Sequence, residues 1–296
     1  MALIHVKPAT QGREKFPLQA QFARLVEQTA NQAPVPRGIA MTAASAPHLH
    51  EPRAATHRPI VLELGGAVID PCSNCDARSV SVCSAIDDDG LARLAAAAVR
   101  TTLEPGQEFI AEGEPATHFF NITAGTARLF KLLPDGRRQI TGFAGRGHFL
   151  GLAVSDTYAF GAEAIGPMSI CRFTRSKMLG LLDEFRTLEQ KLLQTARSEL
   201  VTAQEQMLLL GRKTARERLA SFLLAHAKAG SACGIAARTL ELPMTRADIA
   251  DYLGLTIETV SRSFTKLRGD GLIALEGANS VVIRNLAALE DAAGGA

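Results

Sequence analysis

The chain has 296 residues, 47% of them hydrophobic, and a formal net charge of +2. This length predicts about two domains, each able to bury a core. A charge near zero neither requires nor excludes nucleic acid, so local patterns have to decide. The cysteines number five, and an odd count argues against a secreted disulfide framework. Met1–Lys15 contains no apolar run typical of a signal peptide, and Leu94–Val99 is too short to cross a bilayer. We therefore expect a cytoplasmic protein with no membrane partner.

Residues 1–70 show no regular hydrophobic period and mix Pro, Ala, His and Arg. We expect a flexible N-terminal extension, with a short amphipathic helix over Leu18–Thr29. His48 and His50 lie in a Pro/Ala stretch, and we interpret them as surface residues rather than metal ligands.

Residues 87–98 predict a helix that begins at three aspartates, because negative charge is favoured at a helix N-terminus. From about residue 101 to 173, short apolar runs alternate with turns rich in Gly, Pro and Asp. Turns spaced this closely indicate an antiparallel sandwich or barrel. Pro134-Asp135-Gly136 predicts a hairpin turn between strands at 127–133 and 137–143.

Residues 176–211 predict one long helix with an apolar stripe. A stripe of this length needs a partner surface, and we favour a dimer seam over packing on the chain's own sheets. The stripe comprises Leu181, Phe185, Leu188, Leu192, Leu200, Ala203, Met207 and Leu210.

A helix-turn-helix follows. Thr245 is a suitable N-cap for a first helix, and Asp248 completes a capping box. Gly254 allows the tight turn, and Thr256 caps a second helix. The second helix is expected to bury a stripe formed by Ile257, Val260, Phe264 and Leu267. Residues 271–275 and 280–283, on either side of Gly277, predict a hairpin wing.

The second helix also predicts a DNA-reading face, comprising Glu258, Ser261, Arg262 and Thr265, with Thr256 at its start. In a major groove, Glu accepts a hydrogen bond from cytosine N4 and Arg donates two to guanine. The alternative is an intrahelical ion pair between Glu258 and Arg262.

The stretch MTRADIADYLGLTIETVSR, from Met244 to Arg262, closely resembles the DNA-binding motif of the CRP/FNR superfamily of transcription regulators. KTARERLA, from Lys213 to Ala220, is similar to that family's link between its dimer helix and its DNA domain. The resemblance covers about residues 70–290.

The resemblance implies an α+β fold with a cyclic-nucleotide-binding-like β-roll, a long dimerisation helix and a C-terminal winged helix-turn-helix. The expected boundaries are an extension over 1–70, a sensor domain over 71–175, the dimerisation helix over 176–211 and the DNA-binding domain over 212–296. It also implies a homodimeric activator, not an enzyme, that contacts RNA polymerase. Its DNA site would be a palindrome of TTGAT-type half-sites, read by Glu258, Ser261 and Arg262.

The sensed signal has to be inferred from the sensor domain itself. Cys72, Cys75 and Cys83 place three thiols on one segment, and a tetracysteinyl iron–sulfur cluster needs a fourth. The resemblance to FNR-type oxygen sensors implies that Cys171, the only cysteine in the predicted roll, supplies it. The spacing resembles the FnrN/FnrL/FixK-like branch, being longer between the second and third cysteines than in FNR itself. The expected cofactor is therefore a [4Fe–4S] cluster, whereas Cys233 is expected to be no ligand.

A cyclic nucleotide is not expected as a ligand. Leu152 stands where cyclic-nucleotide members of the family carry a glutamate, and no Lys or Arg occurs between Gly147 and Cys171. A phosphate there would meet Asp156 and Glu163 without a cation. We interpret Gly145, Gly147 and Gly151 as turn glycines.

Two other interpretations stay open. Thiolates also bind zinc, and a thiol pair can act as a redox sensor without metal, so the chain could be a regulator that senses through thiols, zinc or haem. A cysteine-nucleophile enzyme is the alternative from another class. No Cys/His or Ser/His/Asp motif supports it, because His118 and His148 lie in predicted turns.

Overall fold

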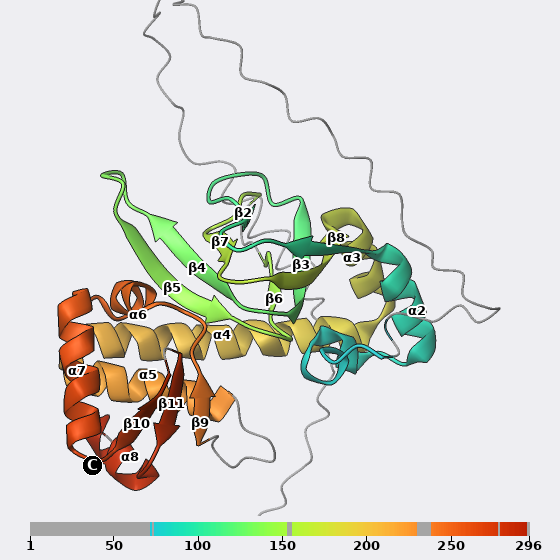
Figure 1. Cartoon of the computed structure of the whole chain (residues 1–296). Coiled ribbons are helices and arrows are strands. Elements are labelled where there is room, and N and C mark those ends of the chain that lie inside the picture. Colours follow the sequence, from blue (N-terminus) through green and yellow to red (C-terminus); the bar gives the residue numbers. More distant parts are fainter. Residues whose placement is uncertain (1–71, 73, 153–155, 230–237, 278, 295–296) are drawn as a thin grey trace, which may run out of the picture. The chain divides into compact units, whose positions relative to one another are not determined.

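The computed structural model describes residue 72 and residues 74–152, 156–229, 238–277 and 279–294. The expected extension over 1–70, with Leu18–Thr29, His48 and His50, lies outside these residues, as does Cys233. Figure 1 gives the element labels used below.

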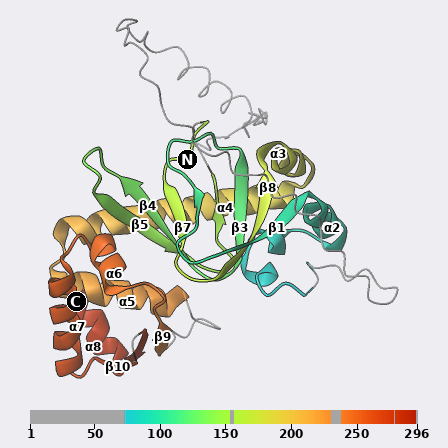
Figure 2. The ribbon, with the colours of Figure 1, turned by 45° about the horizontal axis from the view of Figure 1, so that its top comes forward.

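The first described part consists of two antiparallel four-stranded sheets, with the strand orders β1-β8-β3-β6 and β2-β7-β4-β5 (Figures 1 and 2). The core between them contains Leu103, Ile110, Phe120, Ile122 and Ile170. The predicted hairpin is present, and Gly136 accepts the positive φ of 83° that its turn requires. The strands are β1 (Ala98–Leu103), β2 (Glu108–Ile110), β3 (His118–Ala124), β4 (Ala127–Leu132), β5 (Arg138–Ala144), β6 (Phe149–Leu150), β7 (Gly161–Ala164) and β8 (Met168–Thr174).

A second apolar cluster covers the opposite face of the β1-β8-β3-β6 sheet. Two short 3-10 helices, η1 (Arg78–Val80) and η2 (Val82–Ala85), precede the predicted helix, which is α2 (Asp88–Ala97). Asp87 caps α2 through the N–H of Gly90. Because side chains alternate along a strand, Met168 and Ile170 of β8 enter the inner core while Cys171 and Phe173 face this outer cluster.

The prediction of a single long helix over 176–211 is wrong, because the helix is interrupted at Phe185. The structure has two helices, α3 (Arg175–Glu184) and α4 (Arg186–Arg212). The backbone of Phe185 is extended there, with φ −106° and ψ 91°. Phe185 was counted in the α4 stripe, but its ring lies against Gly90 of α2, where an added Cβ would meet it at 2.9 Å. Helix α3 packs on β8 and β3 before α4 begins.

Helix α4 leads from the two sheets to the C-terminal domain (Figures 1 and 2). Its first turns are buried through Leu188 and Leu192, which pack in the outer cluster. Further along, Leu200 is 61% exposed and Met207 is 73% exposed. Within the described part of the chain, Leu200 and Met207 thus lack cover, whereas Leu210 at the end of the predicted stripe packs against the core of the C-terminal domain.

The C-terminal domain has one core built by four helices and a three-stranded sheet of order β10-β11-β9. The predicted wing is β10 and β11, to which the structure adds β9 as a third strand. Its elements are α5 (Ala215–Ala229), β9 (Thr239–Glu241), α6 (Arg246–Leu253), α7 (Ile257–Gly269), β10 (Ile273–Glu276), β11 (Ser280–Ile283) and α8 (Leu286–Ala292). No helix in the described ranges is both long and apolar enough to span a membrane.

Candidate cysteine site and nucleic-acid interface

The structure brings the four predicted ligand cysteines to one cavity. Cys72, Cys75 and Cys83 lie on the cysteine segment, by which we mean the described residues from 72 to 83, and Cys171 lies on β8. The cavity is otherwise walled mainly by apolar side chains, including Leu91, Leu94 and Phe173. Groups nearly ninety positions apart in the chain therefore meet at one place.

Burial dominates the acid–base properties of two of these thiols. It raises the pKa of Cys171 to about 11, and the positive charge of Arg100 opposes that rise. Burial also raises the pKa of Cys83, while a hydrogen bond with the Ser81 side chain lowers it. Both thiols must release a proton to become metal ligands, so metal binding here is coupled to proton release.

The space between the sulfurs is small. The cavity measures about 20 Å³, room for about one water molecule. Among the described residues, no three His, Cys, Asp or Glu side chains are arranged to hold a single metal ion. The donor set itself, four thiols on one apolar cavity, fits a tetracysteinyl iron–sulfur cluster.

Gly147, between β5 and β6, allows the cysteine segment to lie close to the sheet backbone. Gly147 has a φ of 90°, and a Cβ at this position would lie 2.8 Å from both Cγ2 and the carbonyl oxygen of Val80 in η1. Gly151, with a φ of 94°, approaches the backbone of His118 equally closely. Of the three predicted turn glycines, Gly147 lies in a turn and has this additional contact, whereas Gly145 and Gly151 lie outside the turn.

The helix-turn-helix has the predicted local structure. The Thr245 side chain accepts a hydrogen bond from the Asp248 N–H, and the Asp248 carboxylate accepts one from the Thr245 N–H. Gly254 ends α6 in the left-handed conformation, with φ 61° and ψ 42°, and the Thr256 side chain caps α7. The predicted burial of Ile257 is wrong, because this residue in the first turn of α7 is 49% exposed.

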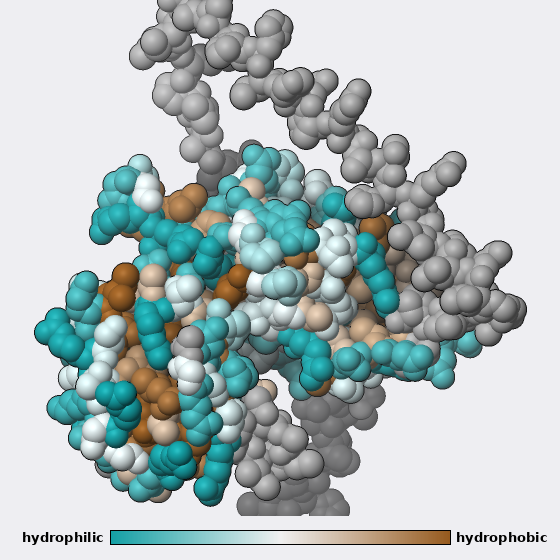
Figure 3. Space-filling view, viewed as in Figure 1, coloured by the Kyte–Doolittle hydropathy of each residue, from teal (hydrophilic) through white to brown (hydrophobic). Residues whose placement is uncertain are grey.

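The predicted reading face of α7 is exposed at every position. Thr256, Glu258, Ser261, Arg262 and Thr265 all lie at the surface. Hydrophilic and neutral side chains cover the edge of the C-terminal domain where α7 runs (Figure 3). The intrahelical ion pair does not form, because Arg262 Nε donates instead to the Glu258 carbonyl at 3.4 Å. A hydrogen bond from its own backbone N–H lowers the pKa of the exposed Glu258 carboxyl, and a hydrogen bond from the Thr256 side chain and the nearby charge of Arg262 act in the same direction.

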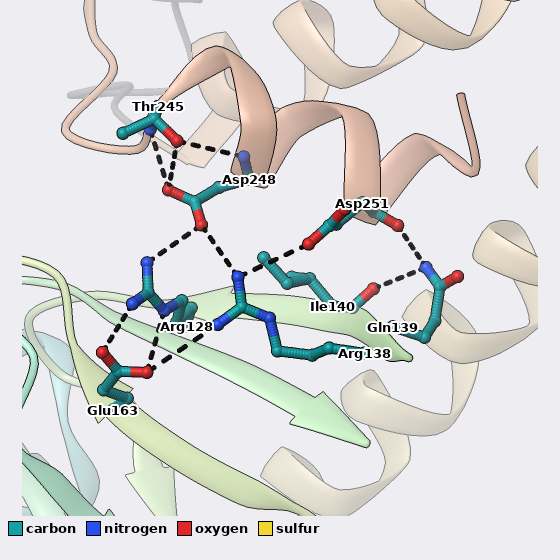
Figure 4. A network of polar contacts seen from close by, with 8 residues as sticks. All are labelled: Arg128, Arg138, Gln139, Ile140, Glu163, Thr245, Asp248 and Asp251. Atoms are coloured by element: carbon teal, nitrogen blue, oxygen red, sulfur yellow. Dashed lines mark hydrogen bonds and ion pairs between the residues drawn. The ribbon is translucent and has the colours of Figure 1, made fainter. Parts of the chain in front are cut away.

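Asp248 has a second role that the sequence did not reveal. Its buried carboxylate accepts a hydrogen bond from Arg128 Nη1 of β4 at 2.9 Å, and Arg128 also pairs with Glu163 of β7 (Figure 4). Arg138 of β5 adds contacts to Asp248 and Asp251, at 3.6 and 3.4 Å. This network joins the β4–β5 hairpin to the first helix of the DNA-binding motif.

Two polar side chains near the cysteines were not predicted from the sequence. Asn121 Nδ2 donates to Cys83 Sγ at 3.8 Å, and Arg100 Nη2 donates to Cys72 Sγ at 3.8 Å. A signal was available for Asn121, which interrupts the apolar run His118–Ala124 as its single amide. Nothing local distinguishes Arg100.

Two family models match the chain. Residues 100–185 match the cyclic nucleotide-binding domain, and residues 217–292 match the Crp-like helix-turn-helix domain. With an exposed α7 on a winged helix-turn-helix, they define a DNA-binding transcription regulator rather than an enzyme.

Curated relatives identify the family. The chain is 44% identical over 204 residues to the nitrogen fixation regulation protein FixK of Bradyrhizobium diazoefficiens, covering 69% of this chain and 86% of FixK. It is 36% identical over 231 residues to the transcriptional activator protein FnrL of Cereibacter sphaeroides, covering 77% of this chain and 93% of FnrL. The solved structure of FixK2 from Bradyrhizobium japonicum matches with a TM-score of 0.61 at 38% identity, over 66% of this chain and 96% of FixK2. The chain belongs to the CRP/FNR family, as the sequence predicted.

Proposed function

We propose that this regulator responds to oxygen through a [4Fe–4S] cluster held by Cys72, Cys75, Cys83 and Cys171, and binds DNA as a dimer when oxygen is low. The observation that carries the proposal is the meeting of these four thiols at one cavity. Four thiolates are the ligand set of such clusters, and the apolar wall limits access of water.

The bound cluster supplies an oxygen-sensitive bond between the cysteine segment and β8. The residues around it connect that bond to the dimer helix. Val82 of η2 packs in the same buried cluster as Leu188 and Leu192 of α4, next to Cys83 and Cys171. Holding the cysteine segment in place therefore fixes the first turns of α4.

The second half of α4 is the proposed dimer seam. Leu200, Val201, Met207 and Leu208 are each more than half exposed, which is costly on a monomer and favourable in a helix pair. Two subunits joined there present two α7 helices to a palindromic site. We propose a TTGAT-type inverted repeat, with Glu258, Ser261 and Arg262 on base edges and Thr256 and Thr265 beside them, and activation through contact with RNA polymerase.

We further propose that no cyclic nucleotide is bound, although the sensor domain matches that family model. Two guanidinium groups from outside the interval Gly147–Cys171 lie near Glu163. Arg128 of β4 pairs with Glu163 and Asp248. Arg138 of β5 lies 3.9 Å from Glu163 and 3.6 Å from Asp248, so both arginines already have carboxylate partners. Calorimetric titration with cyclic AMP should give no binding heat.

The test is the visible spectrum, with iron and acid-labile sulfide analysis, of protein purified without oxygen. We expect four irons per chain in the wild type and in a Cys233→Ser control, and loss of iron and sulfide in Cys171→Ser. Sedimentation should show a dimer before exposure to air and a lighter species afterwards.

Colourless wild-type protein that carries zinc, or no metal, contradicts the proposal and favours a thiol or zinc sensor. A haem spectrum does the same in favour of a haem sensor. Normal iron and sulfide in Cys171→Ser removes Cys171 from the ligand set. None of these results bears on the proposal that α7 binds DNA.

A further inference from the structure

The strand that carries Cys171 has a hydrogen-bond donor on each side of that residue. β8 lies between β1 and β3 in its sheet. Cys171 is the register partner of Arg100 on β1 and of Asn121 on β3. All three side chains line the cysteine cavity.

Each donor reaches past Cys171 to the cysteine segment. Arg100 Nη2 lies 3.8 Å from Cys72 Sγ, and Asn121 Nδ2 lies 3.8 Å from Cys83 Sγ. These distances are in the range of N–H···S hydrogen bonds. One row across the sheet, Arg100–Cys171–Asn121, thus contacts or contains three of the four proposed ligand sulfurs.

Asn121 is an unusual residue for its position. It is 1% exposed, and its Oδ1 has no hydrogen-bond partner among the described residues. A buried amide with an unpaired oxygen is destabilising, and an apolar residue would pack there at lower cost. Within the described ranges, the N–H toward Cys83 is the one hydrogen bond of its side chain. A hydrogen bond from that N–H to a charged Cys83 sulfur would offset the free-energy cost of burying the Asn121 amide.

We infer that Asn121 and Arg100 are outer donors to the proposed cluster, setting its reduction potential and its stability in air. The inference rests on the proposed function. Four thiolates bring negative charge into a poorly hydrated site, and N–H groups aimed at sulfur stabilise that charge. Reduction adds further negative charge, so the donors favour the reduced cluster. Removing either donor therefore makes the cluster easier to oxidise.

The test compares matched variants of the full chain, purified without oxygen. Asn121→Leu keeps the volume and removes the donor, and Asn121→Asp keeps the shape but replaces the donor with an acceptor. Arg100→Met removes a donor that Arg100→Lys retains. Thr123→Val is the control, because Thr123 lines the same cavity but its hydroxyl bonds the Ser169 carbonyl.

Two quantities are measured, namely the midpoint potential by anaerobic redox titration and the rate at which a chelator removes iron. We expect Asn121→Leu and Arg100→Met to have lower midpoint potentials and to lose iron about tenfold faster. Asn121→Asp should shift further in the same direction, whereas Arg100→Lys and Thr123→Val should match the wild type. Circular dichroism checks that each variant is folded.

If the wild type holds iron and sulfide, and Asn121→Leu has an unchanged potential and rate of iron loss, the inference about the donors is overturned while the proposed function stands. A shift in Thr123→Val as large as in Asn121→Leu also overturns it, since cavity packing would then be the cause. Iron-free wild-type protein overturns the proposed function and this inference with it.

Discussion

The cysteine site and the DNA-reading unit differ in how far apart their parts lie in the chain. From Thr245 to Arg262, the caps, the turn and the predicted reading face are local, and both helix caps are closed by residues three positions along the chain. The cysteine site needs Cys171 on a central strand and Cys83 on a segment that docks onto it. Local structure therefore specifies the proposed DNA-reading face, whereas the proposed cysteine site depends on long-range packing.

Asp248 is where the two kinds of structure meet, because it belongs both to the local capping box and to the network with Arg128. It also offers the largest effect on stability. Asp248→Ala leaves Arg128 with one carboxylate fewer in a site where the Asp248 side chain is 3% exposed. We expect a loss of about 3 kcal/mol in the free energy of unfolding, measured by urea denaturation.

The control is Asp251→Ala, whose carboxylate also contacts Arg138 but is 38% exposed. It should cost under about 1 kcal/mol. Equal losses in the two variants would mean that burial of Asp248 has no special weight. If Thr245→Val alone lost as much unfolding free energy as Asp248→Ala, the effect would come from the helix cap and not from the ion pair with Arg128.

Arg262→Ala tests whether the reading face is as independent as its local structure suggests. The variant should lose roughly 1–3 kcal/mol of binding free energy at one base pair and discriminate less at that position. Its iron content should equal that of the wild type. Fluorescence anisotropy with a set of single-base variants of the DNA site measures this.

Arg137→Ala serves as the control for Arg262→Ala, because Arg137 is an exposed arginine in the β4–β5 turn that pairs with Asp135. It should leave binding unchanged. A loss in Arg262→Ala that is uniform across all DNA sequences would assign Arg262 to the phosphate backbone instead.

The smallest effect concerns pH. His226 of α5 packs against Phe222, and burial lowers its pKa below the usual 6.5. The unfolded chain therefore binds the proton more readily, so the stability contributed by neutral His226 is present above pH 6.5 and is lost as pH falls through the folded pKa.

His226→Gln should thus show a weaker loss of unfolding free energy between pH 7.5 and pH 5.5 than the wild type, by urea denaturation at each pH. The exposed His148 gives the control variant, His148→Gln. An identical pH dependence in wild type and His226→Gln would show that His226 is not a source of the acid sensitivity.

The same contrast explains what could be predicted from the sequence. Thr245, Asp248, Gly254 and Thr256 were found because caps and turns have short-range signatures. The break at Phe185 has no short-range signature, and the Phe185 ring lies against Gly90, almost a hundred residues away. The exposure of Ile257 follows from its place in the first turn, which helical periodicity alone does not resolve.

For the cysteine site, spacing indicated a shared segment, but the meeting with Cys171 came from family resemblance and required the sheet register to be seen. Arg100 and Asn121 could not be assigned, because strand pairing places them beside Cys171 and no local pattern predicts pairing between strands so far apart.

The order in which the chain is synthesised gives the position of Cys171 a further consequence. Translation reaches it roughly ninety residues after Cys83. At about 5–20 residues per second, the first three thiols wait roughly 5–20 s for the fourth, and β8 must then pair with β1 and β3. Any group held by all four sulfurs is therefore completed only after Cys171 has been synthesised and β8 has paired, so the four-cysteine site forms late in the folding of the sensor half.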